Sequence, residues 1–175
     1  MQLLITKPGV FSAYGKWISV PQEEENLKEA LKDFDEFIVT DYSGKAVHFE
    51  SFISETMDIF EFNKNLIELD KCHWLTKEAI YAAIDVYESC NFSDFIYDLF
   101  HDKIEVLRMA ETKDWKMSME EAAGRLIWEK NMLKDVNLNG LTESLADWID
   151  WEDVWLNELA WQITQIHGEY YIVRT

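Results

Sequence analysis

The sequence contains little cysteine, proline or glycine, the residues that cross-link, bend or interrupt a chain. Its 175 residues include two cysteines, two prolines and six glycines. Cys72 and Cys90 stand in neither a metal-binding nor a redox spacing, so we expect free thiols and no disulfide framework. Since no linker rich in proline or glycine occurs, the lobe boundaries have to be inferred from changes in hydrophobic period.

Positive charge is also scarce. The chain has 16 lysines and arginines against 34 aspartates and glutamates, which gives a net charge of −18 and a pI near 4.4. A chain this acidic has no surplus cations to displace counterions from nucleic acid, and an anionic membrane surface repels it. We therefore expect binding to neither. With 48% apolar and 14% aromatic residues, the composition excludes disorder and predicts a folded protein.

Long apolar runs and a leader sequence are absent as well. No stretch approaches the roughly 18 apolar residues of a membrane-spanning helix, and Met1–Thr6 lacks the basic start and apolar run of a secretory signal. We expect an intracellular protein of the cytoplasm.

Residues 1–57 alternate between strand and helix patterns. Leu3–Thr6, Tyr14–Val20 and Glu36–Tyr42 are typical of strands, with a turn at Pro8–Gly9. Between the last two, Pro21 suits the first position of a helix, and acidic residues follow where the helix dipole favours them. The apolar stripe of this helix comprises Leu27, Ala30, Leu31 and Phe34. The pattern predicts a β-β-α-β lobe.

The rest of the chain first turns helical and then mixed. Residues 58–101 contain three helix patterns, over 60–69, 74–88 and 92–100. Residues 102–175 begin with a strand pattern over 104–109, and Ser118–Glu121 forms a capping box before a helix. The apolar stripe of that helix comprises Met119, Ala122, Ala123, Leu126, Ile127 and Leu133. Two strands follow, over 161–166 and 169–173. We predict an α+β fold: small antiparallel β/α lobes at both ends (1–57 and 102–175) and a helical middle lobe (58–101).

The sequence offers no pattern on which catalysis would depend. The four histidines are scattered, and Cys72–His73 is the only adjacent pair of possible metal ligands. Phosphate-binding glycine loops, a nucleophile elbow and a calcium-binding loop are all missing. We predict no catalytic residue, no metal and no cofactor. An enzyme that uses a pair of carboxylates is the remaining alternative, although 34 acids make some pairs inevitable.

The acidic residues are distributed along the whole chain and form two runs without a base. Like charges three or four residues apart on a helix each cost about 0.2–0.5 kcal/mol, so selection for stability alone would favour a lysine in some of these positions. From these runs we select a candidate acidic surface of Asp85, Glu88, Asp94, Asp98, Asp102, Glu143, Asp147, Asp150, Glu152, Asp153 and Glu158.

The spacing of these acids is on the scale of a nucleic-acid backbone. Carboxylates four residues apart on a helix are separated by about 6 Å of rise. Duplex DNA carries about one charge per 1.7 Å of axis, so 18 net charges correspond to roughly 30 Å of duplex. A folded array of carboxylates could therefore compete for the cationic groove of a DNA-binding enzyme. A merely acidic surface, as in salt-adapted proteins, is the alternative, although lysine outnumbers arginine 13 to 3.

A second candidate surface is aromatic and lies near the C-terminus. One helical face would carry Leu141, Leu145, Trp148, Trp155 and Leu159, with Trp151 close to it. Two interpretations are open, a hydrophobic core and a self-association surface that makes a homodimer.

Segments at both ends of the chain resemble the ArdA antirestriction proteins. They are Gly15–Ile18 and Glu36–Tyr42 near the N-terminus, and Ala146–Val154 and His167–Val173 near the C-terminus. The resemblance implies an elongated, dimeric DNA mimic from a phage or mobile element, acting in the host bacterial cytoplasm. It further implies an inhibitor that occupies the DNA groove of a Type I restriction-modification enzyme. By the same analogy, 141–159 would be the antirestriction and dimerisation region.

The chain also departs from that family, and these departures leave other targets open. Trp148, Trp151 and Trp155 stand where mostly tyrosine is expected, and four cations between Lys103 and Lys116 interrupt the acidic surface. One alternative target is a Cas effector, which the protein would inhibit as an anti-CRISPR. The other alternative is a protein-interaction regulator that docks through its tryptophan face without mimicking DNA.

Overall fold

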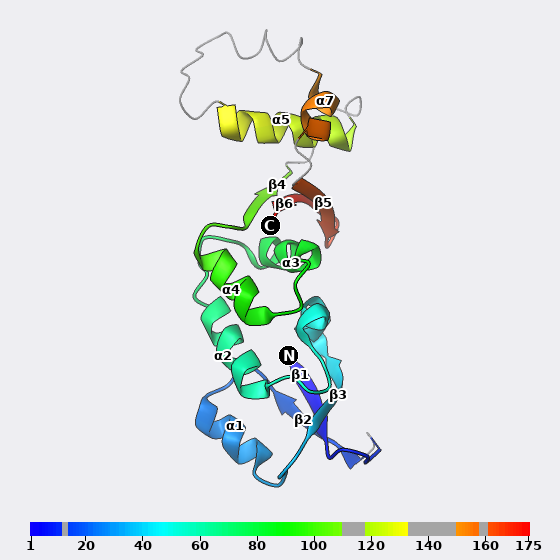
Figure 1. Ribbon diagram of the computed structural model, residues 1–175, viewed down its shortest axis with the longest axis vertical. Helices are drawn as coiled ribbons and strands as arrows, with labels where there is room; N and C mark the ends of the chain where they lie inside the picture. Colours follow the sequence, from blue (N-terminus) through cyan, green and yellow to red (C-terminus); the bar gives the residue numbers. More distant parts are fainter. Residues whose placement is uncertain (12–13, 110–117, 133–149, 158–160) are drawn as a thin grey trace. The chain divides into compact units, whose positions relative to one another are not determined.

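The computed structural model in Figure 1 describes residues 1–11, 14–109, 118–132, 150–157 and 161–175. The chain divides into two compact units, unit 1 (Met1–Lys103) and unit 2 (Ile104–Thr175). Each unit contains a three-stranded antiparallel sheet and helices, so the protein has the expected α+β fold with small β lobes. The predicted lobes 1–57 and 58–101 both fall in unit 1, and the division into three lobes stays a prediction.

Unit 1 begins with a sheet of β1 (Gln2–Thr6), β2 (Lys16–Ser19) and β3 (Ile38–Ser43), in the order β2-β1-β3. Both outer strands run antiparallel to β1, and Leu3 lies opposite Ile18 on one side and Tyr42 on the other. The four residues from Leu3 to Thr6 are buried, as the apolar central strand requires. The three predicted strands of this lobe are confirmed.

Helix α1 (Glu24–Leu31) buries Leu27 and Leu31 of the predicted stripe, but it ends before Phe34, the last residue of that stripe. The predicted start of this helix is wrong, because α1 begins three residues after Pro21. The Asn63 side chain accepts a hydrogen bond from the backbone N–H of Gln22 and donates one to its carbonyl oxygen, both at 2.9 Å. These bonds hold Gln22 outside the helix, since its backbone groups are already satisfied by a residue 41 positions away.

A 3-10 helix, η2 (Gly44–Phe52), follows β3 and was not predicted. It places Phe49 and Phe52 among the rings of the helices that come after it. Phe49 meets Phe62 and Tyr81 edge-on at centroid distances of 6.4 and 6.1 Å. Phe52 stacks on Phe92 at 4.8 Å. The rings therefore join the end of the β lobe to the helices of residues 58–101 within one core.

The three helices predicted for residues 58–101 are present as α2 (Ile59–Leu69), α3 (Lys77–Val86) and α4 (Phe92–Phe100). Helix α3 begins three residues later and ends two residues earlier than predicted. Side chains cap all three. Asp58 accepts from the N–H groups of Phe60 and Glu61, Thr76 accepts from that of Ala79, and Asn91 accepts from those of Ser93 and Asp94. Helices α2 and α4 pack against each other (Figure 1).

Replacing Phe52 tests the role of η2. Phe52→Ala removes a buried ring from the centre of the aromatic cluster, and we expect it to lower the free energy of unfolding by about 3–5 kcal/mol. Val47→Ala is the matched control, because Val47 lies in the same 3-10 helix and is 56% exposed. Urea denaturation followed by near-UV circular dichroism measures both. Equal losses in the two variants would contradict this role.

Unit 2 packs helices on a sheet of β4 (Glu105–Arg108), β5 (Trp161–Ile166) and β6 (Glu169–Arg174), in the order β4-β6-β5. The helices among its described residues are α5 (Met119–Met132) and α7 (Trp151–Asn157). The core contains Met109, Ala122, Ala123, Ile127, Trp161 and Ile172.

The predicted capping box of α5 is confirmed. Ser118 Oγ accepts from the Glu121 N–H at 3.1 Å, and Glu121 Oε2 accepts from the Ser118 N–H at 2.7 Å. In the predicted apolar stripe, Ala122, Ala123 and Ile127 are buried. Met119 is 41% exposed, because it lies at the first turn of the helix and outside the contact with the sheet. Leu133 lies outside the described residues.

Helices α5 and α7 approach each other closely at Gly124. A Cβ atom at this position would lie 2.0 Å from the carbonyl oxygen of Trp151. Alanine is normally favoured over glycine inside a helix by about 0.5–1 kcal/mol. Here the sign is reversed, since the two helix backbones would have to separate to admit a methyl group.

We therefore expect Gly124→Ala to destabilise unit 2 by about 1–3 kcal/mol. Glu120→Ala, at an exposed position of the same helix, is the control and should be close to neutral. Chemical denaturation followed by tryptophan fluorescence measures both variants. A stabilised Gly124→Ala protein would show that α5 and α7 do not approach in this way.

In the parts of the chain that the structure describes, no helix has both the length and the apolar character needed to cross a membrane.

Candidate functional site

The unit 1 part of the predicted acidic surface lies along α3, α4 and the turns that follow them. We call it the α3–α4 acidic segment; it consists of Asp85, Glu88, Asp94, Asp98 and Asp102. Asp85 lies in the last turn of α3 and Glu88 just beyond it, Asp94 and Asp98 lie in the first and last turns of α4, and Asp102 follows α4. All but Asp98 are exposed, and Asp98 is half-buried.

The amphipathic pattern of α4 determines which of its side chains reach solvent. Phe92, Phe95, Ile96 and Leu99 are buried, so Asp94 and Tyr97 point outward. Asp94 is favoured where it is, because a carboxylate in the first turn lies at the positive end of the helix dipole. Asp98 lies at the opposite end, where the dipole disfavours a negative charge.

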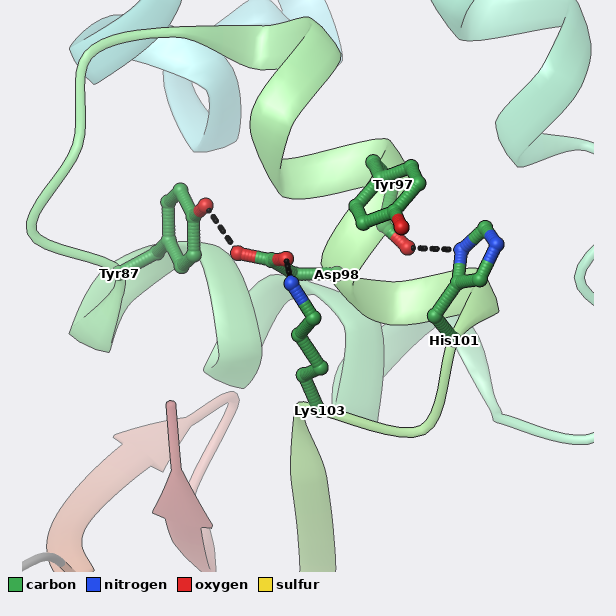
Figure 2. Close-up of polar contacts among 5 residues, drawn as sticks. All are labelled: Tyr87, Tyr97, Asp98, His101 and Lys103. Carbon is green, nitrogen blue, oxygen red and sulfur yellow. Dashed lines mark hydrogen bonds and ion pairs between the residues drawn. The ribbon is translucent and has the colours of Figure 1, made fainter.

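Two neighbouring side chains, Tyr87 and Lys103, stabilise the negative charge of Asp98, as Figure 2 shows. The Tyr87 hydroxyl, at the end of α3, donates to Asp98 Oδ2 at 2.8 Å, and Lys103 Nζ lies 2.8 Å from Oδ1. The lysine hydrogen bond and then that of Tyr87 lower the pKa of Asp98. Burial, assisted by the bond to Asp98, raises the pKa of Tyr87 to about 12. Asp98 therefore connects α3, α4 and the following turn, and Lys103 offsets its charge.

The turn after α4 is also closed by its own contacts. The Lys103 N–H donates to the Asp98 carbonyl oxygen at 3.0 Å, as in helix ends that finish with a left-handed residue. The Tyr97 ring stacks on His101 at 3.9 Å, and Lys103 Nζ lies 4.7 Å from the Tyr97 ring centroid. Figure 2 shows these side chains gathered at one end of α4.

Asp102 is the left-handed residue of this turn, with φ of 55°. Glycine is the usual residue at such a position, because a side chain there is disfavoured by contacts with its own backbone. The chain instead has an exposed carboxylate here. Asp102 therefore costs some backbone energy relative to glycine, and aspartate is one of the few other residues that adopt this conformation.

Unit 1 keeps a large excess of negative charge after its ion pairs are considered. Residues 1–103 contain 20 carboxylate side chains, nine lysines and no arginine, a net charge of −11. The ion pairs that the structure shows here join Lys28 to Glu24, Lys32 to Glu29, Lys71 to Glu68 and Lys103 to Asp98. The first three are exposed pairs of the kind that contribute little to stability. Even if each of the nine lysines neutralised one carboxylate, eleven negative charges would remain in unit 1.

One acid close to the segment was not singled out from the sequence. Glu61, on α2, accepts a hydrogen bond from the Ser93 hydroxyl at 2.7 Å, and the Asn65 side chain donates to the same hydroxyl at 2.8 Å. This places Glu61 beside Ser93, at the start of α4. No sequence pattern could have shown it, because 32 residues separate Glu61 from Ser93.

In unit 2, Asp150, Glu152 and Asp153 are all exposed at the start of α7. Asp150 Oδ1 accepts from the Asp153 N–H at 3.1 Å, which is an ordinary helix cap, and the dipole favours the other two acids in the first turn. The remaining predicted acids of this region, Glu143, Asp147 and Glu158, lie outside the described residues.

The predicted tryptophan face is partly described. Trp151 is buried, and Trp155 packs against the core of unit 2. These two residues take part in packing within unit 2, and the self-association surface stays a prediction. Leu141, Leu145, Trp148 and Leu159 lie outside the described residues.

Within the described residues, no group of three or more histidine, cysteine, aspartate or glutamate side chains is placed to hold a metal ion. Comparison with protein-family models and with curated proteins finds no match to this chain. The resemblance to the ArdA proteins therefore stays a prediction from the sequence.

Because burial and the hydrogen bond to Asp98 raise the pKa of Tyr87, we expect the stability of the protein to depend on pH in the alkaline range. The pKa of Tyr87 rises from 10.0 to about 12 on folding, so the unfolded chain releases this proton first. The stabilisation is complete below about pH 10 and declines as pH rises through about 12.

We expect the free energy of unfolding to fall less in Tyr87→Phe than in the wild type between about pH 9 and about pH 11.5. Tyr14→Phe, which alters an 80% exposed tyrosine of the same unit, is the control and should follow the wild type. Urea denaturation at each pH measures the difference. Parallel pH profiles for Tyr87→Phe and the wild type would contradict the assignment.

Proposed function

We propose that this protein is an acidic DNA mimic that occupies the DNA-binding groove of a host defence enzyme, in the first place a Type I restriction-modification complex. The observation that carries the proposal is the placement of the α3–α4 acidic segment. Its carboxylates follow one another on capped helices and a closed turn, and the sequence places no base between residues 78 and 102. A competitor of DNA needs negative charges that folding holds in position, because a groove recognises their arrangement.

The energetics of the segment support the same function. Asp102 is an acid where glycine would be less strained, and Asp98 lies where the helix dipole disfavours it. Contacts with Tyr87 and Lys103 offset the cost at Asp98, whereas no such contact explains Asp102 among the described residues. A role in presenting negative charge explains Asp102 directly. It also accounts for Asp98, whose contacts with Tyr87 and Lys103 stabilise the end of α4 on which its neighbours lie.

A competition experiment tests the proposal and distinguishes its targets. The purified protein is titrated into a Type I restriction complex, and in parallel into a Cas effector, each bound to labelled duplex at about 50 and 200 mM salt. We expect displacement of the duplex from the restriction complex, weaker at the higher salt. Displacement from the Cas effector alone would instead identify an anti-CRISPR protein.

Two matched sets of substitutions locate the surface. The first combines Asp85→Asn, Glu88→Gln, Asp94→Asn and Asp102→Gly, and we expect it to weaken competition at least about tenfold through lost charge. The second, of equal charge, combines Glu23→Gln, Asp33→Asn, Asp35→Asn and Glu36→Gln at exposed positions around α1, and should have a much smaller effect.

Asp102→Gly alone separates function from folding, since glycine suits a positive φ. It should weaken competition while keeping or raising the stability of the protein. Equal losses from both four-residue sets would mean that only total charge matters. Unchanged binding in both would favour a protein-interaction regulator that does not mimic DNA.

A further inference from the structure

A cavity of about 540 Å³ in unit 1 lies away from the acidic segment's carboxylates and has a different chemical character. Its walls come from η2, the end of α2 and the start of α3. The apolar lining includes Phe49, Leu66, Leu69, Ile80 and Tyr81, all of them buried. This volume and this lining are typical of sites for small organic ligands, which combine apolar walls with a few polar groups.

Two of the nine lysines of unit 1, Lys45 and Lys77, line this cavity. Neither takes part in an ion pair with any residue that the structure describes. Lys77 is the first residue of α3, where the helix dipole disfavours a cation. Both residues are exposed, like the other unpaired lysines of the unit, but these two lie at one apolar cavity, where they could donate to a bound anion.

Tyr81 adds a third donor. It is only 9% exposed, its ring stacks on His48 at 3.9 Å, and burial raises its pKa, so it remains a neutral phenol. Its hydroxyl has no hydrogen-bond partner among the described residues and is not one of the buried polar atoms, so water can reach it when no ligand is bound. A ligand with an acceptor group would take the place of that water.

From these groups we infer that the cavity binds a small organic anion, a carboxylate on a flat apolar body. The apolar body would lie against Phe49, Ile80 and the Tyr81 ring. The carboxylate would accept from the two ammonium groups and the phenol. This site is independent of the proposed DNA mimicry and uses none of its carboxylates.

The net negative charge of the protein does not prevent such binding. Charges farther away than the Debye length, about 8 Å at physiological salt, are largely screened. In the described lining, Lys45, Lys77 and the Met1 ammonium are positive, and Asp70 is the one carboxylate. Asp70 and Glu78 are the acids that interact electrostatically with Tyr81. An anion that accepts from Tyr81 therefore lies near these acids, and the two lysines have to offset their repulsion.

Binding of 2-naphthoate and of its neutral analogue 2-naphthamide tests the inference, with the full chain and calorimetry or NMR titration. We expect saturable binding of 2-naphthoate with Kd below about 1 mM, weaker binding of the amide, and shifted resonances of Phe49 and Ile80. Equal affinity for both compounds, or no saturable binding of 2-naphthoate, would overturn the inference.

Substitutions then assign the contacts. Lys45→Gln with Lys77→Gln should weaken 2-naphthoate at least about tenfold and leave the amide unchanged, because hydrogen bonds to charged groups are the stronger ones. Tyr81→Phe keeps the aromatic ring but removes the hydroxyl, and it should weaken the binding of 2-naphthoate severalfold. Lys7→Gln with Lys64→Gln, at exposed positions outside the cavity lining, is the matched control and should have no effect. Lysine substitutions at the cavity that behave like this control would overturn the inference.

Discussion

The insertion of Phe49 and Phe52 between the helices of unit 1 is the contact on which the candidate surface depends. These two rings meet aromatic side chains of α2, α3 and α4, so the 3-10 helix after β3 becomes part of the helical core. The paired hydrogen bonds between Asn63 and the Gln22 backbone make a second connection, from α2 to the segment before α1. Because of both contacts, residues 1–103 form one compact unit, and the acids of α3 and α4 are held by the same core as the sheet.

Within that unit, the acids differ in what they do. Asp58 is a helix cap, and Asp98 holds two helices together through Tyr87 and Lys103. Asp94 and Asp102 are exposed on the framework that these contacts create. Carboxylates that keep their places through the fold can present a fixed arrangement of charge to a partner, which a flexible acidic tail cannot do.

The cavity beside α3 shows that the charge of the whole chain does not describe each of its parts. Lys45 and Lys77 are 32 positions apart in the sequence. The net charge of −18 gives no indication that they line one cavity with Tyr81. Electrostatic interactions in salt are local, so a cationic site can exist within an acidic protein.

The sequence by itself determined the local elements, because period, capping and turn residues act within a few positions of each other. It predicted the strands of both sheets, α2, α4 and the capping box of α5. Tertiary structure decided what depends on distant contacts. Asn63 delayed the start of α1, the aromatic rings made a helix of 44–52 that has no clear period, and the packing of α2 on α4 brought Glu61 to the acidic segment. These outcomes depend on pairs of residues 13 to 41 positions apart, which no local pattern in a sequence contains.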